Sequence, residues 1–234
     1  MKRKSLTTVA VCALFVAIFM FCGCQPKLTN LEKVNELVSS KQSKLCVGGN
    51  ANFQINLTQM TEEEVFIADG KVGKQVSRTK LSLTPLNASY LKNEYKFVLI
   101  GENEQIEGAF VKDKLGVNFC KELEGLENIG KIKEIDITYG AKTDKLVMSD
   151  ILENAIAFDK ALNIAYTCFQ TKIDSALGEK NFNREVYAKL VCNDAGAQNE
   201  YFWYVSFIAD KDDYWSVLLN LTNGDILNQK ISKL

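Results

Sequence analysis

The sequence has no histidine among its 234 residues. Histidine is the commonest general base and metal ligand in proteins, and it is the side chain whose unperturbed pKa lies nearest to neutral pH. Its absence excludes a Ser-His-Asp or Cys-His mechanism for this chain alone. An enzyme would have to use carboxylates, Lys or Tyr, as a carboxylate-based hydrolase does, but nothing in the sequence selects two of the 29 acidic residues. We therefore expect a non-catalytic protein.

Several binding chemistries also lack their sequence signals. The 28 basic and 29 acidic residues are balanced, so the chain offers no positive field for nucleic acid. No glycine-rich segment is followed by Gly-Lys-Ser or Gly-Lys-Thr, which excludes a phosphate-binding loop of that type. The acidic cluster from Asp210 to Asp213 is interrupted by Lys211 and lies in no 12-residue EF-hand pattern, so we interpret it as a solvated turn. We expect no cofactor and no metal.

The N-terminus has the pattern of an export signal. Three basic residues at positions 2 to 4 precede an apolar run from Leu6 to Cys22. The segment that follows, Phe21-Cys22-Gly23-Cys24, resembles the bacterial lipoprotein signal, in which a cysteine after a small residue is acylated and the preceding peptide is removed. Gly23 fits the small position, whereas Phe21 and Cys22 depart from the usual residues. The resemblance implies a signal peptide of residues 1–23 and lipid attachment at Cys24.

This resemblance predicts where the protein is located. Acyl chains on Cys24 would hold the mature chain on the outer side of a bacterial cell membrane, since two acyl chains give stable anchoring. The alternative is an uncleaved signal anchor, because about 18 apolar residues can just span a bilayer. Both interpretations place most of the chain outside the cytoplasm. Removal of residues 1–23 leaves 25 basic and 29 acidic residues, so the mature chain is mildly acidic.

The remaining cysteines are even in number, which suits an exported protein. Cys46, Cys120, Cys168 and Cys192 contain no Cys-x-x-Cys pair, which argues against a zinc or thioredoxin-like site. If they form disulfides, we expect pairing within each half of the chain, Cys46 with Cys120 and Cys168 with Cys192. Buried thiols are the alternative.

The hydrophobic pattern divides the mature chain. In residues 24–44, the apolar residues Leu31, Val34, Leu37 and Val38 have helical spacing, which predicts a short helix or a tether. Residues 45–142 alternate between apolar and polar with Gly, Asn and Asp between the runs. This pattern predicts an antiparallel β-rich domain, either a small sandwich or a strongly curved sheet.

The period changes in residues 149–234. Ser149 or Asp150 can cap a helix, and apolar residues three and four positions apart predict a long helix from residue 150 to about 177. Strands are predicted at residues 186–192, 201–209, 214–221 and 226–231, and Asn223-Gly224 is a hairpin signal between the last two. The fold class is therefore α+β, with the long helix packed on an antiparallel β-meander.

The C-terminal strands resemble a known family. The segments Trp203-Tyr204-Val205-Ser206-Phe207, Tyr214-Trp215-Ser216-Val217 and Leu221 to Leu227 resemble the end of a PepSY domain (peptidase propeptide and YPEB). That family ends in a hairpin leading into an Asp/Asn-x-x-Thr-Gly-x-Ile/Val-Leu turn. Here Asn220 fills the acidic position and Asn223 is inserted before the glycine. The resemblance covers residues 150–231 and implies an inhibitory or interaction module without catalytic residues.

Aromatic residues provide the candidate partner surface. Alternation along Tyr201 to Tyr204 places Tyr201 and Trp203 on one sheet face and the other two aromatic residues on the opposite face. One face must cover the long helix, and the second is either covered by the N-terminal domain or available to a partner. We name Tyr201, Trp203 and Trp215 as candidate partner residues, since aromatic side chains are enriched at binding surfaces. The functions predicted are binding or restraint of another envelope protein or peptide, or binding of a small ligand, peptide or glycan.

Overall fold

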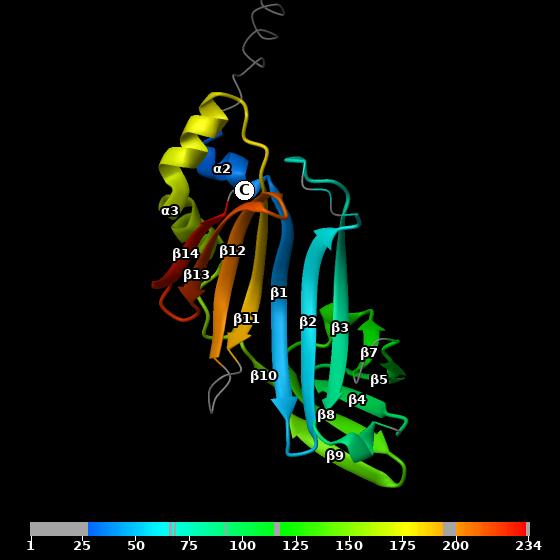
Figure 1. Ribbon diagram of the computed structural model, residues 1–234. Helices are drawn as coiled ribbons and strands as arrows, with labels where there is room; N and C mark the ends of the chain where they lie inside the picture. Colours follow the sequence, from blue (N-terminus) through cyan, green and yellow to red (C-terminus); the bar gives the residue numbers. More distant parts are fainter. Residues whose placement is uncertain are drawn as a thin grey trace, which may run out of the picture.

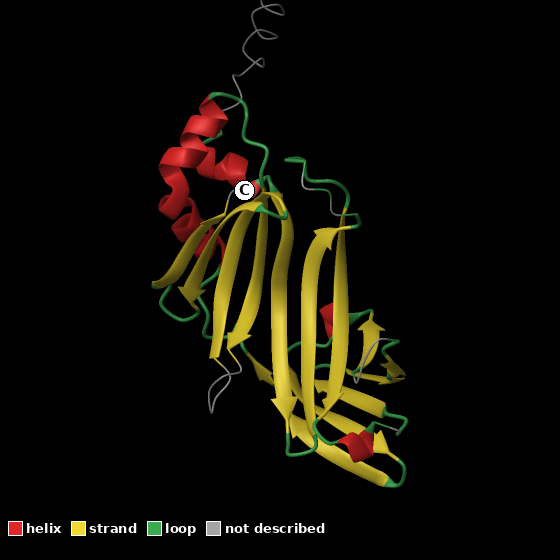
Figure 2. Cartoon of the chain, in the orientation of Figure 1, coloured by secondary structure: helices red, strands yellow, loops and turns green. Residues whose placement is uncertain are grey.

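The computed structural model describes residues 28–65, 67, 69–91, 93–114, 118–193 and 200–232. The predicted signal peptide, and with it Cys24, lies outside these residues. Within them the protein is α+β, mainly β, with two sheets and one long helix (Figure 2). The described residues contain no helix of the length and hydrophobicity needed to cross a membrane.

A large twisted sheet forms the body of the protein (Figure 1). Its strands, in spatial order, are β14 (Ile226–Ser232), β13 (Asp213–Asn220), β12 (Glu200–Asp210), β11 (Glu185–Asn193), β1 (Val38–Gly49), β2 (Phe53–Glu63), β3 (Gln75–Pro85), β7 (Phe119–Leu123) and β6 (Val111–Lys112), with β10 (Ser149–Asp150) also paired to β1. All of these pairs are antiparallel except that of β1 with β11, which is parallel.

A second, smaller sheet packs against part of the large one. It contains, in spatial order, β5 (Gln105–Ala109), β4 (Lys96–Gly101), β8 (Ile132–Tyr139) and β9 (Lys142–Val147). Two short 3-10 helices, η1 (Ala88–Tyr90) and η2 (Leu126–Asn128), lie in the connections. The core between the two sheets is apolar and aromatic, with Phe53 and Tyr95 in edge-to-face contact at 5.6 Å.

The parallel pair of β1 with β11 joins the two halves of the chain. Residues 24–44 were expected to form a tether or a helix, but the helix α2 (Asn30–Asn35) is short and β1 begins at Val38. Thr29 and Glu32 form a capping box that fixes the start of α2. Val38 then pairs with Val186, and the Ser39 hydroxyl donates to the Val186 carbonyl at 3.1 Å. The extended conformation is favoured here because β1 gains a strand on each side.

The long helix α3 (Phe158–Gly178) begins later than the sequence predicts. Ser149 and Asp150 pair with β1 as β10, so the backbone there is extended. The Asp150 carboxylate accepts from the Leu152 N–H at 2.9 Å, which forms a local turn and not a helix cap. The helical period read through residues 150–157 was therefore wrong, because tertiary pairing with β1 overrides it.

Two apolar cores cover the same face of the large sheet. The smaller sheet covers β1, β2 and β3 on the side where Leu57 and Leu81 point. Helix α3 covers β11, β12 and β13 on the side where Val205 points. A bulge between Gln42 and Lys44 in β1 keeps both cores on one side. Because side chains alternate along each strand, the residues between these core residues point to the opposite face of the sheet.

The four cysteines of the described residues are thiols in the structure. Cys46 on β1 and Cys120 on β7 point to opposite faces of the sheet, and two strands lie between them. Three strand spacings are about 14 Å, twice the reach of a disulfide. Cys168 lies beside β14, whereas Cys192 is on β11 with two strands between. Neither predicted pairing fits this geometry.

Candidate functional site

The predicted partner residues lie on the face that α3 covers. Trp203 is only 1% exposed, and its indole N–H donates to the Ile156 carbonyl at 3.1 Å. Tyr201 and Trp215 are half-buried on the same side of the sheet. The prediction of Trp203 as a surface residue was wrong because its face is the floor of the helix-covered core. It is therefore not available to stack on a ligand.

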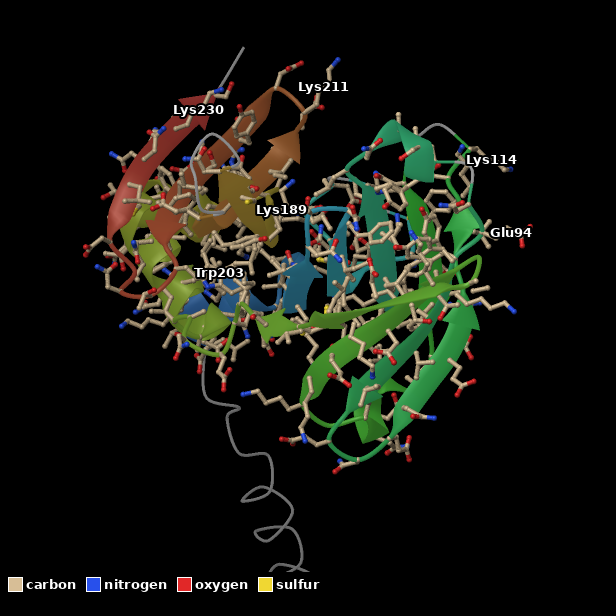
Figure 3. All side chains as sticks on the ribbon, turned by 90° about the horizontal axis from the view of Figure 1, so that it is seen from below. Glu94, Lys114, Lys189, Trp203, Lys211 and Lys230 are labelled. Carbon is tan, nitrogen blue, oxygen red and sulfur yellow. The ribbon has the colours of Figure 1, made fainter. Side chains whose placement is uncertain are left out.

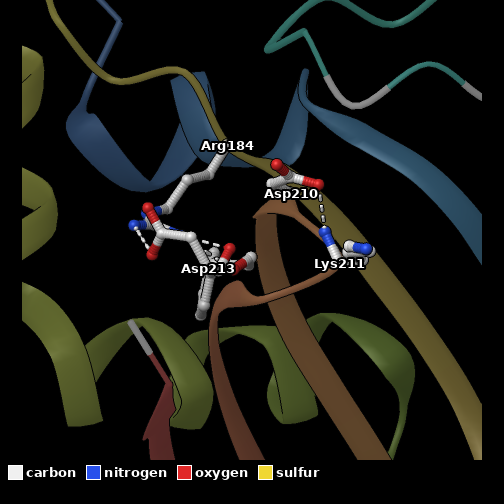
Figure 4. Close-up of polar contacts among 5 residues, drawn as sticks. Arg184, Asp210, Lys211 and Asp213 are labelled. Carbon is white, nitrogen blue, oxygen red and sulfur yellow. Dashed lines mark hydrogen bonds and ion pairs between the residues drawn. The ribbon is translucent and has the colours of Figure 1, made fainter. Parts of the chain in front are cut away.

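Trp215 is held by an arginine that precedes β11. The Arg184 guanidinium lies 4.0 Å from the centre of the Trp215 ring and forms an ion pair with Asp213 at 2.5 Å (Figure 4). It also donates to the Asp213 carbonyl at 2.9 Å. The nearby Asp210 carboxylate accepts from the Lys211 N–H. These contacts stabilise the end of the sheet, and the described residues contain no cluster of His, Cys, Asp or Glu that could hold a metal.

The opposite face of the same strands is not packed against any described helix or strand. Figure 3 shows Lys189 and Lys230 projecting on the side away from α3, whereas Trp203 lies beside the helix. Strand register places eight large side chains on this face, which we call the tyrosine face. They are Tyr187, Lys189, Phe202, Tyr204, Ile208, Tyr214, Leu218 and Lys230.

Small polar residues form the floor of the tyrosine face. A continuous row of paired residues crosses five strands, from Ser40 through Tyr187, Ser206 and Ser216 to Lys230. The three serines are buried beneath their larger neighbours. The hydroxyls of Ser40 and Ser206 have no hydrogen-bond partner among the described residues.

Two lysines of the tyrosine face lie beside its tyrosine rings. Lys230 donates to the Tyr214 hydroxyl at 2.7 Å, and its ammonium group lies 5.1 Å from that ring. The hydrogen bond to Tyr214 raises the pKa of Lys230. The Lys189 ammonium lies 5.7 Å from the Tyr187 ring. In the ion pairs of the described residues, neither lysine has a carboxylate partner.

A buried carboxylate marks one end of this face. Glu185 begins β11 and is fully buried, and it accepts the N–H groups of Asp69 and Gly70 at 3.0 and 3.1 Å. These two residues belong to the connection between β2 and β3, so Glu185 ties that loop to the sheet. Burial raises the pKa of Glu185, the nearby Glu63 adds to this shift, and the two N–H groups oppose it.

A groove runs between α3 and the last strand, β14. Its volume is about 340 Å³, and residues Thr167 to Lys172, Gln229 and Ile231 line it. The helix is kinked at Phe169, two residues after Thr167, whose hydroxyl donates to the Asn163 carbonyl at 2.8 Å. Burial raises the pKa of the Cys168 thiol, so it stays protonated at neutral pH. The groove thus offers weakly polar walls beside a strand edge.

Within the described residues, the tyrosine face presents aromatic side chains and two lysines above a row of buried serines. The sequence pattern did contain the signal for this face: Phe202 and Tyr204 alternate with the helix-facing residues. Sequence alone left open whether the N-terminal half would cover them. The sheet extends sideways through β1 and does not fold over them.

Comparison with known proteins gives no relative: no family model, no curated protein and no solved structure matches the chain.

Proposed function

We propose that the protein is a non-catalytic lipoprotein, anchored outside the cytoplasm through acylated Cys24, that binds or restrains another envelope protein through the tyrosine face. The observation that carries this proposal is the concentration of aromatic and cationic side chains on a sheet face that no described helix or strand covers. Rigid aromatic residues flanked by cations are typical of protein interfaces. The PepSY-like ending of the sequence supports an interaction or inhibitory role.

Site-specific crosslinking in living cells tests the binding face. A photo-crosslinking amino acid at Tyr204, in the full chain, should form an adduct with a discrete envelope protein. The matched control is the same amino acid at Thr58, which lies on the same sheet face but in its polar part. Adducts of equal yield and identity from both positions would contradict a specific site on the tyrosine face. The absence of any adduct at Tyr204 would contradict the proposed function.

Mass spectrometry of the mature protein tests the anchor independently. We expect acylated Cys24 as the first residue, and Cys24→Ala should release the protein from the membrane fraction or stop its processing. An unmodified Cys24, or a mature chain that keeps the segment from Leu6 to Cys22, would contradict the lipoprotein assignment. That outcome would leave the crosslinking result unaffected.

A further inference from the structure

Strand β14 is a long exposed edge of the large sheet. It lies last in the strand order and spans seven residues, whereas the edge strand at the other end, β6, spans two. Proteins usually shorten or block such edges, because the free N–H and C=O groups can pair with another chain. β14 contains no proline and is exposed along almost its whole length. Among the described residues, no strand pairs with its outer side.

The register shows which backbone groups face outward. The Asn220 N–H donates to the Asp225 carbonyl, so Asn220 bonds toward β14. Alternate residues of β13, including Ser216 and Tyr214, then bond toward β14 as well, and their partners are Lys230 and Ser232. The N–H and C=O groups of Gln229 and Ile231 therefore point away from β13. They can pair with one more antiparallel or parallel strand.

An added strand would meet different chemistry on its two faces. On one side, its side chains would enter the groove between β14 and α3, against Cys168, Phe169 and Ile231. On the other side, they would lie next to Lys230 and Tyr214. Because side chains alternate along a strand, the two environments select alternate residues of the added segment.

The charge around this edge selects an acidic partner. Lys230 projects on the tyrosine face, and Lys172 lines the groove on the opposite side with its ammonium group 5.8 Å from the Trp215 ring. No carboxylate pairs with either lysine in the ion pairs of the described residues. A segment bearing carboxylates would be attracted from both sides, whereas a second copy of β14 would bring another Lys230 to this edge.

We propose that β14 is the docking edge for an extended acidic segment of the partner protein, which adds as a further strand with apolar side chains in the groove and carboxylates against Lys230. The inference rests on the proposed function and names the kind of partner segment. Backbone pairing supplies affinity, and alternation of apolar and acidic residues supplies specificity. The added strand extends the tyrosine face by one strand.

Labelled synthetic peptides test the docking edge on the full chain in a mild detergent. We expect fluorescence anisotropy to detect binding of a peptide of about ten residues that alternates valine and glutamate. The same peptide with alternate amides N-methylated, on the set that pairs with β14, should bind about tenfold more weakly or worse, because each methyl group removes a donor and obstructs the ladder. Methylation of the other set should have a small effect. Equal binding of all three peptides, or no binding of any, would overturn the proposal.

Variants of the protein give the complementary test. Ile231→Pro removes an outward N–H at an edge position that tolerates proline, and it should weaken binding about tenfold, whereas Ile231→Val should bind like the wild type. Lys230→Glu should weaken the glutamate peptide by about threefold to tenfold and improve binding of a lysine-containing counterpart. If Ile231→Pro does not fold, the methylated peptides still decide the question. Self-association of the chain that Ile231→Pro abolishes would assign the edge to a second copy and overturn the acidic partner.

The crosslinking experiment separates this inference from the proposed function. If the adduct formed from position 204 persists unchanged in the Ile231→Pro protein, the partner binds the tyrosine face without using the edge, and only the edge inference fails. If the adduct is lost in Ile231→Pro and retained in Ile231→Val, the edge inference is supported. If no adduct forms at all, the proposed function fails.

Discussion

The N-terminal and C-terminal parts of the large sheet are covered alike on one face and differ on the other. The smaller sheet and α3 each bury an apolar core against the same side. On the opposite side, β2 and β3 present mainly small or polar residues, such as Asn56, Thr58 and Ser82. The strands β11 to β14 present tyrosines, Phe202 and lysines instead. The same sheet thus has a polar surface in one part and an aromatic surface in the other.

This difference separates the residues needed for folding from those available for binding. The N-terminal part shows that a polar open face is sufficient for these strands to pair. Aromatic residues on the C-terminal open face are therefore not required by sheet formation. The aromatic side chains of this face are half-buried, and aromatic residues are enriched at protein interfaces. Because of this difference between the two parts of the open face, we assign the proposed function to the tyrosine face.

Truncation of the covered faces should give the largest effects. Phe53→Ala in the N-terminal core and Trp203→Ala in the C-terminal core should each lower the free energy of unfolding by about 3 to 5 kcal/mol, because both side chains are fully buried. Tyr204→Ala, on the open face, should cost about 1 kcal/mol or less. Chemical denaturation measures all three. Equal losses for Trp203→Ala and Tyr204→Ala would show that the open face is part of the core.

Loss of Arg184, the residue that precedes β11, should have the next largest effect. Arg184→Met leaves Asp213 without its ion pair and removes donors to backbone carbonyls, while its side chain can still contact Trp215. We expect a decrease of about 1 to 3 kcal/mol in the free energy of unfolding, because the arginine is buried but Asp213 is partly exposed. Arg184→Lys is the control and should retain part of this stability. A loss that is the same in both variants would assign the effect to the planar guanidinium and not to its charge.

The pH dependence of stability should depend on Glu185. Its pKa in the folded protein is raised by burial and by Glu63. The folded state then holds this proton to higher pH than the unfolded state, so stability falls as pH rises from the ordinary glutamate pKa through the raised value. Glu185→Gln cannot ionise and should flatten this part of the profile. Melting temperatures measured from pH 4 to 8 check this, and identical profiles for the two proteins would contradict it.

The strands of the C-terminal meander could be predicted closely from sequence, because alternation and turn residues are local signals. The predicted strand at residues 201–209 corresponds to β12 at Glu200–Asp210, and Asn223-Gly224 lies in the turn before β14. The division of the apolar residues between two cores follows the change of period only in part, because Val34 of α2 belongs to the core under α3. Local patterns could not show that β1 pairs with β11, since that contact joins residues almost 150 positions apart. Non-local pairing likewise converted Ser149 and Asp150 from a predicted helix start into β10.

The candidate partner residues named from the sequence lie on the face that α3 covers, so they differ from the residues of the proposed tyrosine face. Sequence identified the aromatic run from Tyr201 to Tyr204 and its two faces. It could not assign α3 to one of them, because helix position depends on the packing of Trp203 against Ile156 and Phe158. The bulkier tryptophans were taken as binding residues, whereas in the structure they fill the larger volume under the helix. The smaller aromatic residues, such as Phe202 and Tyr204, lie on the other face.

Removal of one positive charge from the open face should have the smallest effect on stability. Peptide binding should then distinguish the C-terminal part of this face from the N-terminal part. Arg78 on β3 forms an exposed ion pair with Glu62 at 3.8 Å, so Arg78→Gln should change the free energy of unfolding by less than about 0.5 kcal/mol. Lys230→Gln on β14 should be equally mild, because Lys230 is exposed and its hydrogen bond is to the Tyr214 hydroxyl. Binding of the glutamate peptide should fall for Lys230→Gln and remain unchanged for Arg78→Gln, although each variant removes one positive charge from the same sheet face. If both variants weaken binding equally, general electrostatic attraction is the cause, and the distinction between the polar and aromatic parts of this face is not functional.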